Sequence, residues 1–103
     1  MSEEIVVYVD ADLEEITPEF LENRHEDIQH ITRLLESDEI AEIQRLGHSM
    51  KGSGGGYGFH EVTRIGDALE QAAKQGDKMK IRELNERLAQ YLSVVKVVYQ
   101  EMG

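Results

Sequence analysis

Hydrophobic residues recur at intervals of three and four positions along most of this chain, and this spacing predicts amphipathic helices. Short polar or glycine-containing stretches interrupt the pattern and mark turns. We therefore predict four helices, over residues 18–36, from 37 or 38 to about 57, 59–75, and 77 to about 101. Helices joined by very short turns pack as antiparallel neighbours. The predicted fold is all-α, an up-down-up-down antiparallel four-helix bundle with a short N-terminal extended segment and helix packed on it.

Residues with helix-capping side chains stand at the predicted helix ends. Thr17 is expected to be the N-cap of the first helix, because a proline follows it at the first helical position. Ser37 or Asp38 is expected to cap the second helix. Gly76 and Asp77 provide a stop for the third helix and an N-cap for the fourth. The inner side of the fourth helix is expected to contain Ile81, Leu84, Leu88, Tyr91 or Leu92, Val95 and Val98.

The N-terminal segment is harder to assign from its pattern. Residues 5–9 form a short β-branched run, which periodicity alone does not assign to a helix or a strand. We interpret the run as extended chain packed on the bundle, and the alternative is an edge strand left from a larger protein. Asp10 or Asp12 is expected to cap a short helix that continues to Ile16.

Composition and charge narrow the class of protein. A length of 103 residues suits one domain, spanning residues 1–103, and the absence of cysteine excludes disulfides and thiolate metal sites. No apolar stretch approaches the roughly 20 residues that cross a bilayer, so we expect a soluble, cytoplasmic protein. The formal net charge of −10 disfavours nucleic acid and anionic membranes as partners.

The stretch from Gln44 to Gly58 combines a helical pattern with an unusual glycine content. Its apolar stripe consists of Ile40, Ile43, Leu46 or Gly47, Met50, Gly54 and Tyr57. His48 falls nearly opposite this stripe, so it is expected to be exposed. The residues that share its side of the helix are Gln44, Arg45, Lys51 and Gly52, with Gly55 one turn further on. Each glycine costs a helix about 0.5 to 1 kcal/mol relative to alanine, which indicates that another surface must approach closely.

Two other kinds of site fit this sequence poorly. The spacing of Gly47 and Gly52 resembles that of a P-loop, but Ser53 follows where that motif has lysine, and no strand precedes. His25 and His30 are five residues apart, which does not place two imidazoles on one side of a helix as zinc ligands. We therefore predict neither a nucleotide site nor a metal site.

The residues around His48 resemble a known family. The run His48-Ser-Met-Lys-Gly-Ser, with Gly58 ten residues after the histidine, is similar to the H-x-x-K-G-(S/A) signature of histidine phosphotransfer (HPt) domains. The likeness extends to residues 9–13, 18–21, 58–59 and 65–70, so it covers nearly the whole chain. The resemblance implies a helical bundle whose histidine accepts a phosphoryl group from a receiver-domain aspartate, or from a sensor kinase relay, and passes it to another receiver.

The residue types suit this chemistry. A neutral imidazole keeps one unprotonated nitrogen near pH 7, so His48 can attack phosphorus without a separate base. Lys51 can offset the charge of the transferring group, and the lack of a side chain at Gly52 clears the approach. Glu70 lies where some family members have glutamine, and it is expected either to bind the second imidazole nitrogen or to pair with Lys51. Lys74, one turn beyond, can assist docking or simply be solvated.

On this interpretation the protein is a phosphorelay carrier and not an enzyme, with no ATP site. It requires no cofactor of its own, because Mg²⁺ belongs to the receiver partner. The expected partners are response-regulator receiver domains and a hybrid sensor histidine kinase, and we expect a monomer. The alternative function is a helical docking module that binds receiver domains without carrying phosphate. An enzyme is a weaker third possibility, since the sequence indicates no substrate pocket.

Overall fold

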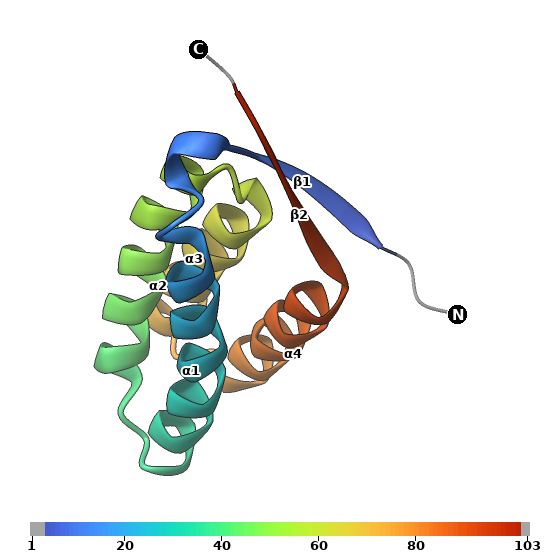
Figure 1. The fold of residues 1–103 in the computed structure, drawn as a ribbon. Helices are drawn as coiled ribbons and strands as arrows, with labels where there is room; N and C mark the ends of the chain where they lie inside the picture. The colour runs from blue at the N-terminus through green and yellow to red at the C-terminus, as the bar shows by residue number, and fades with distance from the viewer. Residues whose placement is uncertain (1–3, 102–103) are drawn as a thin grey trace.

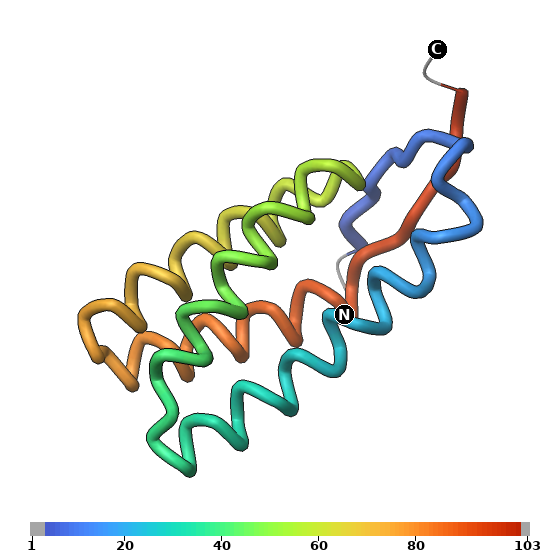
Figure 2. The backbone as a smooth tube through the Cα atoms, turned by 90° about the vertical axis from the view of Figure 1, so that its left-hand side faces the viewer, coloured from blue at the N-terminus to red at the C-terminus, as the bar shows by residue number. Residues whose placement is uncertain are grey.

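A computed structural model describes residues 4–101, which contain four α-helices arranged as a bundle (Figure 1). The helices are α1 (Thr17–Glu36), α2 (Ile40–Gly54), α3 (His60–Lys74) and α4 (Lys78–Val94). Successive helices run in opposite directions, as the tube in Figure 2 shows. α1 packs against α2 and α4, and α3 packs against the same two helices. The predicted antiparallel four-helix bundle is confirmed.

The core lies between the inner sides of the four helices, as the hydrophobic spacing predicts. Its largest fully buried side chains include Ile31, Ile43, Met50, Phe59, Ile65, Leu69, Ile81, Leu84 and Leu88. Phe20 of α1 stacks on Tyr57 and Phe59, with ring centroids 4.3 and 5.4 Å apart. These rings join α1 to the turn between α2 and α3, and so they support the C-terminal end of α2.

Two of the predicted N-caps are wrong. Thr17 is the first residue of α1, and its buried hydroxyl donates a hydrogen bond of 2.7 Å to the carbonyl of Leu13. α2 begins only after Glu39, without a side-chain cap. Neither Ser37 nor Asp38 can cap it, because the amide of Ser37 still bonds to α1 and Asp38 adopts a left-handed φ of 58° to make the turn.

The predicted junction between the third and fourth helices is confirmed. Gly76 has a φ of 66°, a left-handed conformation that glycine adopts without steric cost. The carboxylate of Asp77 then accepts a hydrogen bond of 3.1 Å from the amide of Lys80 in the first turn of α4. Asp38 forms an ion pair with Lys78, which ties the α1–α2 turn to the start of α4.

The prediction that the last helix runs to about Glu101 is wrong. α4 ends at Val94, and the residues that follow form strand β2 (Val95–Gln100), so Val95 and Val98 do not lie on a helix. β2 lies beside β1 (Ile5–Asp10) and runs parallel to it (Figure 1). Their register places Ile5 opposite Val95. Both segments are rich in β-branched residues, which favour a strand once a partner is present. The predicted extended N-terminal segment is therefore one strand of a two-stranded sheet.

A single 3₁₀ turn, η1 (Ala11–Leu13), leads from β1 towards α1 and is shorter than the helix predicted to reach Ile16. The carboxylate of Asp10 caps it by accepting a hydrogen bond of 2.9 Å from the amide of Asp12. Within residues 4–101, no helix is both long and apolar enough to cross a membrane.

Candidate functional site

His48 projects from the side of α2 that faces away from the core. The buried side of this helix consists of Ile43, Gly47, Met50 and Gly54, so Gly47 and not Leu46 is the fully buried member of the predicted stripe. The side chain of His48 is 74% exposed. The imidazole is therefore accessible to a partner, as the helical spacing predicts.

A close backbone contact between α2 and α3 places the third helix beside His48. A methyl group added at Gly47 would lie 2.8 Å from the carbonyl oxygen of Gly66, and one added at Gly66 would lie 2.5 Å from the amide nitrogen of Lys51. Real side chains do not approach backbone atoms this closely, so both positions require glycine. The contact brings the side chain of Glu70, one turn after Gly66 on α3, within reach of α2.

Glu70 holds the imidazole from the inner side. Its Oε2 atom lies 3.0 Å from Nδ1 of His48, and the Glu70 side chain is only 10% exposed. An ionised carboxylate can only accept hydrogen bonds, so the proton between these atoms belongs to Nδ1. The lone pair of the neutral ring is then on Nε2, the nitrogen that does not face Glu70.

Lys51 is bound by two carboxylates of α3. Its Nζ atom lies 3.1 Å from Oδ1 of Asp67 and 3.8 Å from Oε1 of Glu70. The hydrogen bond to Asp67, followed by the charge of that carboxylate, raises the pKa of the Lys51 ammonium. Glu70 thus does both things that the sequence left open, since one oxygen faces His48 and the other faces Lys51.

Sequence reasoning missed Asp67. Asp67 precedes Glu70 by three residues, so the two carboxylates occupy the same side of α3. Placing α3 beside His48 because of Glu70 would have placed Asp67 there as well. The spacing of Asp67 and Glu70 in the sequence therefore already places Asp67 beside Glu70 on α3.

Of the residues predicted to dock a partner, Gln44, Arg45 and Gly52 lie on α2, Gly55 follows the last residue of α2, and Lys74 is the last residue of α3. Gln44 is half-buried, whereas Arg45 is exposed and pairs with Glu42 at 3.1 Å. A methyl group at Gly52 would meet no atom within 4 Å, and one at Gly55 would meet only the Thr63 hydroxyl, at 3.7 Å. Lys74 is exposed at the end of α3. The surface beside His48 is thus open on the side of α2 where the sequence predicts clearance.

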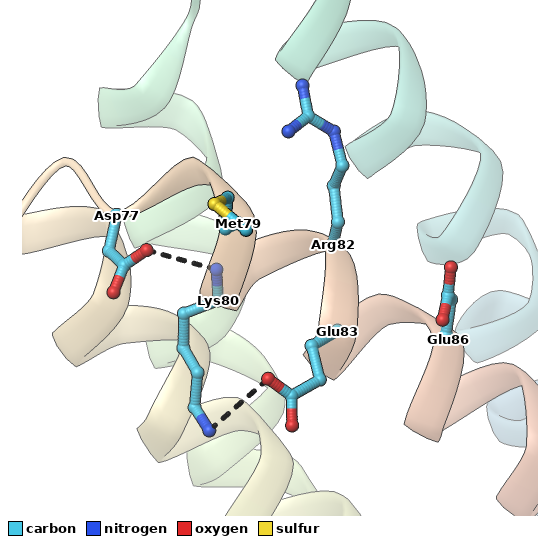
Figure 3. Close-up of a pocket in the computed structure, with 6 residues that line it drawn as sticks. All are labelled: Asp77, Met79, Lys80, Arg82, Glu83 and Glu86. Carbon is cyan, nitrogen blue, oxygen red and sulfur yellow. Dashed lines mark hydrogen bonds and ion pairs between the residues drawn. The ribbon is translucent and has the colours of Figure 1, made fainter.

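Among residues 4–101, no group of three or more acidic or histidine side chains is placed to bind a metal ion. A surface hollow of about 500 Å³ at the start of α4 is lined by Asp77, Met79, Lys80, Arg82, Glu83 and Glu86 (Figure 3). Its polar contacts are a helix cap and an ion pair of 3.7 Å between Lys80 and Glu83, both of which stabilise the helix itself.

Comparison with known proteins gave one finding. A family model described as "Hpt domain" matches residues 15–97 of the chain. Searches of curated proteins and of solved structures returned no significant match. The matched region contains His48, Asp67, Glu70 and the whole of the four-helix bundle.

Proposed function

Because the chain belongs to the Hpt domain family, whose members are phosphotransfer carriers of two-component signalling and not kinases, we propose that His48 is the phosphorylated residue. His48 accepts a phosphoryl group from a receiver-domain aspartate, or from a sensor kinase relay, and passes it to another receiver. Hpt domains interact with response-regulator receiver domains, which supports these partners. A hybrid sensor histidine kinase as a further partner, a monomeric state, a cytoplasmic location and a single domain over residues 1–103 stay predictions.

One observation carries the proposal: the exposed imidazole of His48 is held through Nδ1 by Glu70, at 3.0 Å. In the transfer, the Nε2 lone pair forms a bond to phosphorus while the bond from phosphorus to the aspartate oxygen breaks. The aspartate leaves as a carboxylate with the bonding electrons. The ring becomes cationic and keeps its proton on Nδ1, where the Glu70 carboxylate stabilises it. Transfer to the next receiver runs through the same steps in reverse.

Lys51 supplies positive charge beside the reacting group. Its ammonium lies on the α3 side of α2, bound to Asp67 and Glu70, and its side chain is 43% exposed. Because this side chain is half-exposed, it can rotate towards phosphoryl oxygens on His48 while the backbone of α2 stays in place. There it offsets the negative charge of the transferring group.

A receiver must bring its active site close to the imidazole, and the open side of α2 provides the space. Gly52 and Gly55 give clearance, while Gln44, Arg45 and Lys74 offer polar and positive groups at the edge of the contact. The receiver's own Mg²⁺ neutralises charge on the phosphoryl group during transfer, so this chain requires no cofactor.

The experiment that tests the proposal is incubation of the protein with a phosphorylated receiver domain. We expect phosphate on the protein that is labile to acid and stable to base, as a phosphoramidate bond is. The His48→Gln variant should fold with an unchanged melting temperature, because an exposed side chain contributes little packing, and it should carry no phosphate. Phosphate on the variant would exclude His48. A wild-type protein that binds receivers without becoming phosphorylated would instead be a docking module.

A further inference from the structure

Asp67 has no part in the proposed transfer, although it is the closest charged group to Lys51. Its Oδ1 atom lies 3.1 Å from the Lys51 ammonium, whereas Glu70 Oε1 lies 3.8 Å away. Both partners are partly exposed, Asp67 by 49% and Lys51 by 43%. An exposed ion pair of this kind is weak and exchanges readily, so a stronger anion nearby can take the ammonium from Asp67.

The backbone of Lys51 is fixed by its contact with α3, so it does not move when the side chain moves. Its amide nitrogen lies against Gly66, where an added methyl group would come within 2.5 Å of it. Asp67 is the next residue after Gly66, so the α2–α3 contact fixes the positions of both backbones. Only the side chain of Lys51 can therefore move its ammonium from Asp67 to a phosphoryl group on His48.

We propose that Asp67 is a positioning residue that competes with the phosphoryl group of His48 for the Lys51 ammonium and thereby favours discharge of the phosphohistidine. This inference rests on the proposed function of His48.

The direction follows from the charges. A phosphoryl group on Nε2 carries about two negative charges, and the Asp67 carboxylate that binds Lys51 adds another. Contact with Lys51 stabilises the phosphorylated state, but forming that contact breaks the ion pair with Asp67. When the bond between Nε2 and phosphorus breaks and the phosphoryl group moves to a receiver aspartate, the ion pair forms again. Asp67 therefore stabilises the unphosphorylated state relative to the phosphorylated one.

The test uses the full chain and its Asp67→Asn variant, each phosphorylated with phosphoramidate. In this reaction a bond from His48 to phosphorus forms as the donor's P–N bond breaks and ammonia leaves. The phosphorylated proteins are then mixed with an unphosphorylated receiver, and the phosphate remaining on each protein is measured once transfer has reached equilibrium. We expect the ratio of phosphorylated to unphosphorylated protein to be about two- to fivefold higher for the Asn variant than for the wild type, the size expected for losing an exposed ion pair.

Two further variants make this result specific. Asp67→Glu keeps the carboxylate and should keep nearly the wild-type equilibrium ratio. Glu83→Gln removes the same charge from another exposed lysine pair, that with Lys80 on α4 (Figure 3), and should have no effect. An unchanged equilibrium ratio in Asp67→Asn would overturn the proposal, and so would an equal rise of the ratio in Glu83→Gln.

An independent measurement separates this inference from the proposed function. Because Asp67 raises the pKa of Lys51, Asp67→Asn should lower it, and NMR titration of the lysine detects this change in the unphosphorylated protein. A lowered pKa with an unchanged equilibrium ratio would show that the ion pair exists but does not influence transfer, which overturns the inference alone. If wild-type His48 accepts no phosphate from phosphoramidate or a receiver, the proposed function fails and the inference fails with it.

Discussion

On the side of α2 that packs against α3, a methyl group at Gly47 would lie 2.8 Å from the Gly66 carbonyl oxygen; on the His48 side, one at Gly52 would meet no atom within 4 Å. The same residue type thus serves two purposes on one helix. Glycine on the packed side lets two backbones touch, which brings Glu70 to His48 and Asp67 to Lys51. Glycine on the open side leaves space that no other residue of the chain fills. The first kind is required by the close packing of α2 against α3, and the second suits the approach of another molecule.

The largest expected effect comes from Lys51, whose backbone contacts α3 and whose ammonium pairs with Glu70, the residue that also contacts His48. Lys51→Ala should slow phosphoryl transfer by about ten- to a thousandfold, because it removes the charge that stabilises the transferring group. Stability should hardly change. Single-turnover transfer from a phosphorylated receiver measures the first expectation, and thermal unfolding the second. A wild-type transfer rate in Lys51→Ala would show that Lys51 only forms an ion pair with Asp67 and has no part in transfer.

Substitution of a glycine at the contact between α2 and α3 should cause the largest loss of stability. Gly66→Ala places a methyl group 2.5 Å from the Lys51 amide, so the helices must separate. We expect a loss of about 1 to 3 kcal/mol in the free energy of unfolding, measured by urea denaturation. The matched control is Gly52→Ala, which adds the same methyl group in open space and should not destabilise the protein. Equal stabilities for the two variants would remove the distinction between the two sides.

Bulky residues on the open side should impair transfer without unfolding the protein. Gly52→Gln and Gly55→Arg should keep the wild-type circular dichroism spectrum and slow transfer from a receiver by about tenfold or more, because a small misplacement of the reacting groups is costly. Phosphorylation by phosphoramidate, a small donor, should be nearly unaffected in both variants. If transfer from a receiver is also unaffected, the glycines do not provide clearance for a partner.

The smallest expected effect is a gain in stability. Gly55 has right-handed helical dihedrals, with φ −64° and ψ −34°, and an added methyl group would make only an ordinary contact of 3.7 Å with the Thr63 hydroxyl. Gly55→Ala should therefore increase the free energy of unfolding by about 0.5 to 1 kcal/mol. Thermal unfolding detects a change of this size. A loss of stability would show that the open side also has a structural need for glycine.

Local sequence patterns predict the helical part of this structure well, because each amphipathic stripe depends only on residues a few positions apart. The exposure of His48 follows from its place opposite the stripe, and the Gly76–Asp77 junction follows from turn chemistry. The role of Gly47 and Gly66 is different, since their contact depends on how closely two helices approach. Spacing alone shows that such residues face inward and does not show that their backbones touch.

The C-terminal strand was not predicted from the sequence, for a similar reason. Val95 and Val98 continue the three- and four-residue spacing of α4, so a local pattern assigns them to the helix. Their β-branched neighbours favour a strand only when a partner is present, and that partner begins at Ile5, far away in sequence. The Asp67–Lys51 pair likewise joins two helices. Both of these features were missed because they depend on segments far apart in the sequence, whereas the wrong N-caps at Thr17 and at Ser37 or Asp38 are local errors.

The parallel pairing of β1 with β2 has a mechanical consequence. In this register Ile5 lies beside Val95 at one end of the sheet, and Asp10 lies beside Gln100 at the other. A force that pulls Ile5 and Gln100 apart acts along the strands, so all the hydrogen bonds between them bear the load together. An antiparallel pair pulled from two adjacent ends would instead open one bond at a time. Tension applied through Ile5 and Gln100 would thus be borne first by the sheet, leaving the helix that carries His48 unstrained until the strands slide past each other.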